Sequence, residues 1–382
     1  DTGPDTPGRL LLIIDHLVVD AVSLRILLPD LAEAYAALAA GRETALEPVP
    51  TSFRHWARAL AAEAASEERL AELPEWIQFL QGPDPLITSR PVDSGRDIGA
   101  TMRQLSVQVP TEITSELLTS VPAAFHAGID DVLLTGLTAA IAEWRRKRGQ
   151  DPAGVLVDLE GHGRIPLGDG DDLSRTVGWF TNSHPVRLDA GAVDLTDLRA
   201  GGPAAGRAVK RIKEQLRAVP GDGLGYGLLR HLNPETAPTL AALPTAQIGF
   251  NYLGRFASKP TGRAGTQSDR QKDWQQAGEG GRGGETNAQI PVMHGLEVMG
   301  VVHDLTDGPR LSLIVAWAAD LLEESAVQAL ADGWAAMLTG LAAHTAGSGS
   351  GGYTPSDFPL VEISQGELDE FEVAAKQIEE GA

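Results

Sequence analysis

Residues 10–24 of the chain read Leu-Leu-Leu-Ile-Ile-Asp-His-Leu-Val-Val-Asp-Ala-Val-Ser-Leu. The five apolar residues 10–14 follow a turn region rich in Pro and Gly, and such a run predicts a short buried strand. Apolar residues then recur at helical spacing over 21–40, which predicts a helix that ends at Gly41. The stretch therefore predicts a strand that leads into a helix through a polar junction.

His16 and Asp20 lie at this junction. A neutral imidazole placed there can act as a general base near pH 7. Asp20, four residues on, could orient the ring or pair with an arginine. The plainer alternative is a polar corner in which Asp20 only caps the helix, and the spacing alone favours that alternative.

A second polar junction follows a strand predicted over 155–159, where the chain continues as Glu-Gly-His-Gly-Arg at 160–164. Two glycines around a histidine indicate a tightly turned backbone. A carboxylate at a strand end, here Glu160, is well placed for proton transfer. Taken alone, the segment fits an ordinary polar loop somewhat better than a catalytic one.

Three further segments have unusual composition: Arg-Thr-Val-Gly-Trp-Phe-Thr at 175–181, Gly-Leu-Gly-Tyr-Gly-Leu-Leu-Arg at 223–230, and Phe-Asn-Tyr-Leu-Gly at 250–254. Taken alone, the first fits a core strand. The last predicts a strand with one polar edge, from which the hydroxyl of Tyr252 can face a reaction chamber. For the last segment, an ordinary core strand is the alternative.

Together the five segments resemble the condensation superfamily of nonribosomal peptide synthetases, in its epimerization-like branch. Residues 15–20 are similar to the family's His-His-x-x-x-Asp core, with His16 as the second His. Residues 160–164 match the Glu-Gly-His-Gly-Arg signature, in which the family's Glu is a catalytic acid/base. The order and spacing of the segments agree with the family over most of the chain. Departures fall inside the motifs, namely Asp15 for the first His, Leu24 for a Trp, Ile165 for a Glu, and Glu297-Val298-Met299 where the family tends to end in Asn.

Strands that alternate with helices predict an α/β fold. The resemblance implies a two-lobed fold related to chloramphenicol acetyltransferase, the condensation-domain fold. Family members carry a long segment before the His motif, so we expect the first lobe to be incomplete in this chain. The expected division is 1–95 for the remainder of the N-terminal lobe and connecting helices, 96–346 for the C-terminal acetyltransferase-like lobe, and 347–382 for a spacer and an acidic C-terminal linker helix.

Periodicity predicts further helices and strands along the chain. The segment 257–290 is polar and rich in Gly and is predicted to be a mobile loop, while Ser364 and Glu367 match a helix capping box. Helices are predicted over 52–66, 67–80, 112–119, 128–148 (with Asp130 as its cap), 203–217 and 325–343, and strands over 104–109, 246–253, 295–303 and 311–317.

Composition limits the possible partners and chemistry. The 382 residues include no Cys, which excludes disulfides, Cys-ligated zinc and thiol nucleophiles. The net charge of −21 argues against a nucleic acid partner. We find neither a signal segment nor a long apolar run, so we expect no membrane association and a cytoplasmic protein. The histidines lack metal-ligand spacing, so no metal site is expected, and His126, His231 and His294 are predicted to be structural.

The resemblance implies two functions. The departures inside the motifs favour a non-catalytic X-type domain, which in glycopeptide antibiotic synthetases recruits cytochrome P-450 oxygenases to a carrier-bound peptide, and the negative charge would suit a basic partner. The alternative is an active epimerization domain that inverts the Cα of an aminoacyl or peptidyl thioester. His16 and Glu160 would then be the acid/base pair, with Asp20 and Tyr252 as further site residues and Tyr252 supporting the oxyanion.

In both cases the substrate would arrive on the phosphopantetheine arm of a peptidyl carrier protein domain, with no cofactor bound directly. Neighbouring synthetase domains would be further partners.

Overall fold

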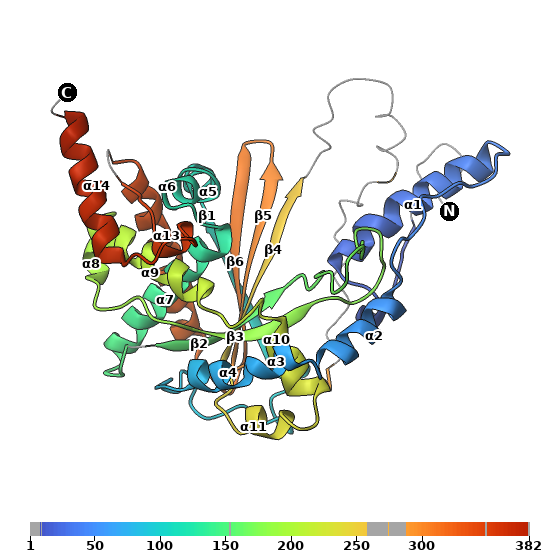
Figure 1. Ribbon diagram of the computed structural model, residues 1–382, viewed down its shortest axis with the longest axis horizontal. Coiled ribbons are helices and arrows are strands. Elements are labelled where there is room, and N and C mark those ends of the chain that lie inside the picture. The colour runs from blue at the N-terminus through green and yellow to red at the C-terminus, as the bar shows by residue number, and fades with distance from the viewer. Residues whose placement is uncertain are drawn as a thin grey trace.

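A six-stranded mixed β-sheet forms the centre of the molecule (Figure 1). The structure is a computed structural model that describes residues 8, 10–152, 154–257, 274, 288–347 and 350–380. The strands lie in the order β1-β6-β5-β4-β2-β3, and only the pairs β2/β4 and β4/β5 are parallel. Their bounds are β1 Met102–Val109, β2 Val155–Gly161, β3 Asn182–Leu188, β4 Ile248–Ala257, β5 Leu296–Leu305 and β6 Gly308–Ala318.

A layer of helices covers one face of this sheet (Figure 1). The long helix α7 is buried along most of its length, and α13 packs across it. Gly136 of α7 makes this approach possible, because a Cβ there would lie only 2.7 Å from the Leu338 side chain. The layer consists of α5 (Thr111–Leu118), α6 (Ser120–Phe125), α7 (Ile129–Lys147), α8 (Leu195–Arg199), α9 (Pro203–Arg217) and α13 (Glu324–Thr345).

Shorter helices cover only part of the opposite face. Leu156 of β2 packs there against Leu80 and Ala246, and Trp76 packs beside Leu229 and Leu240. The polar residues of β1 on the same face, such as Ser106, remain exposed. We call this the open face of the sheet. The covering elements are α2 (Phe53–Glu63), α3 (Glu67–Ala71), α4 (Leu73–Leu80), α10 (Leu224–Gly227), a π-helical turn over Leu228–Leu232, and α11 (Ala237–Ala241).

Helix α1 (Ala21–Ala39) forms an arm that stands apart from the helix layer, and α14 (Gln365–Glu380) lies on the far side of the molecule (Figure 1). The predicted capping box of α14 is confirmed, since Ser364 and Glu367 exchange side-chain to backbone hydrogen bonds. Single 3-10 turns lie at His16–Val18, Gly99–Thr101 and Pro355–Asp357.

The expected α/β class is confirmed, and every predicted helix and strand outside three regions has a counterpart. The first exception is 10–14, which is not a strand: its side chains are exposed, and none of the six strands of the described sheet pairs with it. A lone strand can bond only to water, so an apolar run does not by itself make a strand. The segment 175–181 is irregular, and β3 starts only at Asn182.

The third exception is 67–80, which divides into α3 and α4 at Glu72. The cap predicted for α7 was also misplaced by two residues. Gly128 is the cap, and its N–H donates to Asp131 at 2.6 Å. Most of the loop predicted over 257–290 lies outside the described residues.

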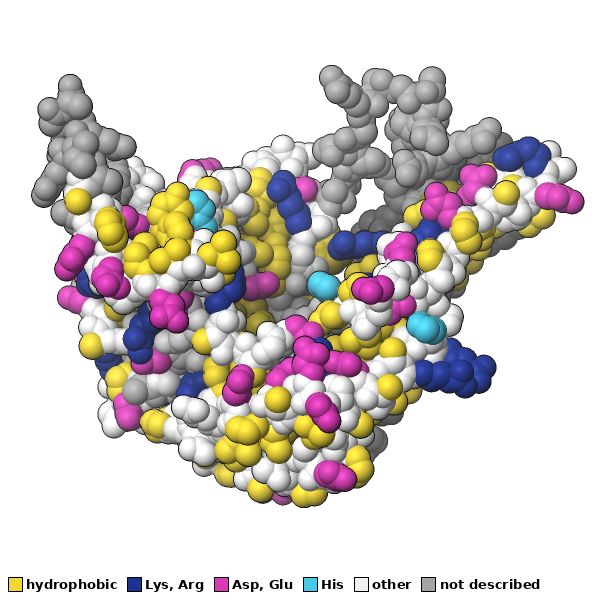
Figure 2. Space-filling view, viewed as in Figure 1, with side chains coloured by type: hydrophobic (Ala, Val, Ile, Leu, Met, Phe, Trp, Pro, Cys, Tyr) yellow, Lys and Arg dark blue, Asp and Glu magenta, His cyan; other side chains and the backbone are white. Residues whose placement is uncertain are grey.

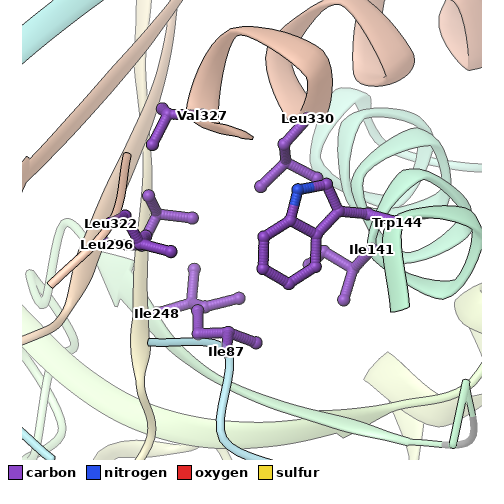
Figure 3. Close-up of a pocket in the computed structure, with 8 residues that line it drawn as sticks. All are labelled: Ile87, Ile141, Trp144, Ile248, Leu296, Leu322, Val327 and Leu330. Carbon is purple, nitrogen blue, oxygen red and sulfur yellow. The ribbon is translucent and has the colours of Figure 1, made fainter. Parts of the chain in front are cut away.

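A small apolar cavity lies between the sheet and the helix layer (Figure 3). Ile248 and Leu296 line it from the strands, and Ile141 and Trp144 line it from α7. The only polar side-chain atom among them, Nε1 of Trp144, already donates to the carbonyl of Ala326 at 3.0 Å. The cavity therefore offers nothing to a polar substrate, and we assign it to imperfect packing.

Within the described residues, no single helix is both long and apolar enough to cross a membrane. One pair, Thr111–Phe125 with Ile129–Lys147, meets those criteria only when its two halves are added together, and it is bent by 101°.

Candidate active site

Glu160 lies at the end of β2 on the open face of the sheet. The register of β2 and β4 pairs Leu159 with Phe250, so Glu160 and Asn251 lie side by side on the opposite face. Phe250 is buried against Trp334 of the helix layer, whereas Glu160 is exposed. Figure 2 shows the molecule hollowed between the strands and the arm that carries α1.

The surroundings of Glu160 favour its protonated form. Although Glu160 is exposed at the surface, the protein around its carboxyl group displaces part of the surrounding water and raises its pKa, and the negative charge of Glu297 raises this pKa further. The positive charge of His16, a hydrogen bond from Asn251 and the charge of His294 act in the opposite direction. A carboxyl group with a raised pKa can exchange a proton with a substrate closer to neutral pH.

His16 reaches this site from the α1 arm. The 3-10 turn that carries it is capped by Asp15, whose carboxylate accepts from the N–H of Leu17 at 2.9 Å. The His16 ring is exposed and meets the ring of Trp179 edge-on, with centroids 5.4 Å apart. The charge of His16 lowers the pKa of Glu160, so the two predicted acid/base residues lie within electrostatic range of each other.

Asp20 has a different position, buried behind the turn. It caps α1 by accepting from the N–H of Ser23 at 2.6 Å, and it pairs with Arg164 at 2.9 Å. Burial alone would raise the pKa of Asp20, but hydrogen bonds from Ser23 and Arg164 outweigh it and hold that pKa below its usual value. The two structural alternatives that the sequence left open, cap and arginine pair, therefore both occur, and any catalytic role of Asp20 stays a prediction.

The glycines of the 160–164 segment are required by close contacts. Gly163 has a φ of +62°, and a Cβ there would overlap the carbonyl oxygen of Phe180. A Cβ on Gly161 would lie 2.8 Å from the side-chain oxygen of Asn182. This tight turn directs Arg164 back towards Asp20, and the guanidinium also lies 4.2 Å above the Phe180 ring.

Ser23 and Arg175 tie the α1 arm to the 175–181 segment. The Ser23 hydroxyl donates to the carbonyl of Gly178 and accepts from its N–H, at 2.9 and 3.0 Å. Arg175 pairs with Asp30 further along α1 at 2.7 Å. These bonds hold the turn that carries His16 against the body of the protein.

Tyr252 does not join the other predicted site residues. It is two residues beyond Phe250 and pairs with Gly300, so it lies on the helix-covered face of the sheet. Burial raises the pKa of its hydroxyl, and the charge of Asp130 raises it further. Support of an oxyanion by Tyr252 therefore stays a prediction, and Asn251 is the residue of this strand that contacts Glu160.

The sequence interpretation overlooked Asn251 and His294. Asn251 was inside a quoted motif, and strand alternation between two core-facing neighbours was the signal that could have identified it. His294 was predicted to be structural. In the structure it bonds to Asp158 at 2.7 Å and to Glu297 at 2.8 Å, on the same face as Glu160. Within the described ranges, no group of three or more His, Asp or Glu side chains could hold a metal ion.

Comparison with known sequences gives a consistent result. A profile of the condensation domain family matches residues 5–358. The chain is 37% identical to a linear gramicidin synthase protein of Brevibacillus parabrevis over 373 residues, which is 97% of this chain and 4% of that protein. It is 30% identical to tyrocidine synthase 1 of the same organism over 97% of this chain and 32% of that protein. The chain thus spans less than a third of these relatives.

Solved structures agree with the sequence comparison. The epimerization domain from the third module of tyrocidine synthetase B superposes with a TM-score of 0.70 and 31% identity, over 87% of this chain and 68% of that one. The X-domain from teicoplanin biosynthesis gives a TM-score of 0.54 and 19% identity, over 86% and 68%. The complex of that X-domain with OxyB gives 0.54 and 17%, over 86% and 66%. These likenesses confirm the fold that the motifs predict.

Proposed function

Because the chain belongs to the condensation domain family of nonribosomal peptide synthetases, in its epimerization-like branch, we propose that it inverts the Cα of a carrier-bound aminoacyl or peptidyl thioester. The substrate would be held on the phosphopantetheine arm of a peptidyl carrier protein domain, the partner expected beside neighbouring synthetase domains. On sequence alone this activity was the alternative, and the surroundings of Glu160 in the structure support it.

The observation that carries the proposal is that Glu160 and Asn251 share the open face, with His16 of the α1 arm near enough for its charge to act on Glu160. Epimerization needs one group to remove the Cα proton and another to return a proton from the opposite side. The electron pair released at Cα moves onto the thioester carbonyl oxygen, and reprotonation of Cα restores the thioester with no net change in atoms. Glu160 comes from strand β2 of the sheet, and His16 comes from the turn that precedes α1.

Each residue has a role that follows from its surroundings. Glu160 has the raised pKa of a group that passes protons, and Asn251 orients it by hydrogen bonding. Asp20 is occupied by Arg164, and the exposed ring of His16 instead meets the ring of Trp179 edge-on. Asp15 caps the turn that carries His16, and the imidazole on that turn is exposed.

Recruitment of cytochrome P-450 oxygenases, the function that the motif departures favoured, is the second candidate. Asp15, Leu24 and Ile165 still support it. The likeness to the X-domain is below 20% identity and supports the fold without a shared activity. Recruitment would need an intact surface but neither His16 nor Glu160.

The test is exchange of the Cα proton with deuterated water, using the intact synthetase with its carrier domain loaded. We expect deuterium at Cα in the wild type, and at least a hundredfold slower exchange in His16→Ala and Glu160→Gln. His126→Asn and Glu116→Gln, far from the open face, are matched controls that should exchange normally. An absence of exchange in the wild type, together with co-elution of a P-450 oxygenase, would instead establish recruitment.

A further inference from the structure

His294 is held between two carboxylates that come from different strands. Its Nε2 lies 2.7 Å from Oδ2 of Asp158 on β2, and its Nδ1 lies 2.8 Å from Oε1 of Glu297 on β5. His294 is buried, with 8% of the residue exposed. With both nitrogens facing carboxylates at hydrogen-bond distance, the imidazole is best satisfied as the cation, which donates from both nitrogens.

The strand between the two carboxylates makes room for this arrangement. The sheet register pairs Asp158 with Gly249 of β4, and Gly249 with Glu297. A Cβ on Gly249 would lie 2.7 Å from Nδ1 of His294, and it would overlap the Glu297 carboxylate. The glycine therefore lets the imidazole cross β4 and connect β2 to β5.

The bridge acts on Glu160. Glu160 is two residues beyond Asp158 on the same strand, so both side chains lie on the open face. The charge of Glu297 opposes ionisation of Glu160, and the charge of His294 favours it. The other groups that face this cluster are His16 from the 3-10 turn and Asn251 from β4, both acting on Glu160, together with His184 from β3 and Tyr226 from α10, whose titrations respond to Asp158.

We propose that His294 is a positioning residue for Glu160: as an imidazolium clamped by Asp158 and Glu297, it fixes the Glu297 carboxylate on the face of the sheet that carries Glu160 and cancels part of its charge. The clamp thereby sets the pH range in which Glu160 can accept a proton. The inference rests on the proposed function for its catalytic meaning, but its electrostatic content can be measured without any turnover.

Two substitutions should move the titration of Glu160 in opposite directions. His294→Gln removes the positive charge and should raise the pKa of Glu160, whereas Glu297→Gln removes a negative charge and should lower it. The measurement is a pH titration of the ¹³C carboxyl resonance of Glu160 in glutamate-labelled protein, assigned by its loss in Glu160→Gln. The lower limb of the pH–rate profile for Cα deuterium exchange should move the same way in each variant.

A third variant tests the geometry of the clamp while its charged residues are all retained. Gly249→Ala places a methyl group in the clamp, which should shift the pKa of Glu160 and lower the pKa of the His294 ring. His344→Gln, on α13 behind the sheet, is the matched histidine control and should leave Glu160 unchanged. Thermal unfolding monitored by circular dichroism identifies any variant that fails to fold, and Asp158→Asn, which releases the other side of the clamp, then takes its place.

The outcomes separate the two proposals. If the pKa of Glu160 rises in the His294 variant and falls in the Glu297 variant, but the wild type exchanges no deuterium, the clamp is supported and the proposed function is overturned. If the pKa of Glu160 shifts in the same direction in both variants, or in neither, the clamp is overturned whatever the exchange experiment shows, because a merely structural histidine would not produce shifts of opposite sign.

Discussion

The Arg164 guanidinium donates to both carboxylate oxygens of Asp20, at 2.9 and 3.1 Å. Asp20 lies four residues after His16, and Arg164 lies four residues after Glu160. One buried ion pair therefore joins the two segments that carry the proposed acid and base. The pair helps to hold these two segments together, whereas the His16 ring is exposed on a single 3-10 turn.

Replacing Asp20 by Asn should test how much the pair contributes. Asn still caps a helix, so the cap is kept, but Arg164 is left buried without its counter-charge. We expect the free energy of unfolding to fall by about 3 kcal/mol, measured by urea denaturation. Asp369→Asn, which breaks the more exposed pair with Lys210, should cost about 1 kcal/mol or less. Equal losses in both variants would contradict the structural role of the buried pair.

The His294 clamp should make stability depend on pH. The two carboxylates raise the pKa of His294 to about 9, although burial alone would lower it. Its ordinary value of 6.5 applies to the unfolded chain. The stabilisation is thus fully present below about pH 6.5 and is lost as the pH rises through about 9.

Over that window the wild type should lose on the order of 3 kcal/mol more of its unfolding free energy than His294→Gln does. Urea denaturation at pH 6 and pH 9.5 measures this difference. Parallel losses in the two proteins would show that the ring is not held as a cation.

Gly163→Ala should be among the most destabilising single-methyl changes in the chain. The positive φ is unfavourable for alanine, and the new Cβ would overlap backbone of Phe180 that cannot move without breaking the turn. We expect a loss of several kcal/mol in the free energy of unfolding. Gly227→Ala is the control, because its backbone is helical and a Cβ there has nothing within 4 Å. It should be neutral or slightly stabilising.

Local pattern was sufficient for the regular elements and insufficient for the site. The helix over Pro203–Arg217 was predicted with its actual bounds, because its period and its final basic residues are local signals. The run 10–14 was predicted wrongly as a strand, because pairing depends on a neighbour that no local pattern reveals. Asp20 left two structural alternatives open for the same reason, since its partner Arg164 is 144 positions away.

The clamp at His294 likewise depends on a partner that the local sequence does not reveal. Nothing near His294 in the sequence indicates Asp158, which is 136 positions away and is brought close only by the parallel register of three strands. The sequence motifs identified Glu160 and His16, because a carboxylate and an imidazole can transfer protons wherever they lie. The motifs could not identify the neighbouring side chains that shift the pKa of Glu160, because register and strand alternation decide which residues share a face.

Glu160→Gln should stabilise the protein at neutral pH while removing the proposed activity. The folded state raises the pKa of Glu160, so it binds this proton more tightly than the unfolded chain does. The corresponding stabilisation is present below about pH 4.5 and is lost as the pH rises through the raised pKa, which leaves the ionised carboxylate unfavourable at pH 7.

Gln cannot ionise, so the Glu160→Gln variant should unfold at a higher temperature than the wild type at pH 7 and at about the same temperature at pH 4. Differential scanning calorimetry at the two pH values, with Glu116→Gln on α5 as the control away from the open face, measures the effect. A Glu160→Gln protein that is less stable than the wild type at pH 7 would mean that the carboxylate is held by favourable contacts, and the site would then be structural and not poised for proton transfer.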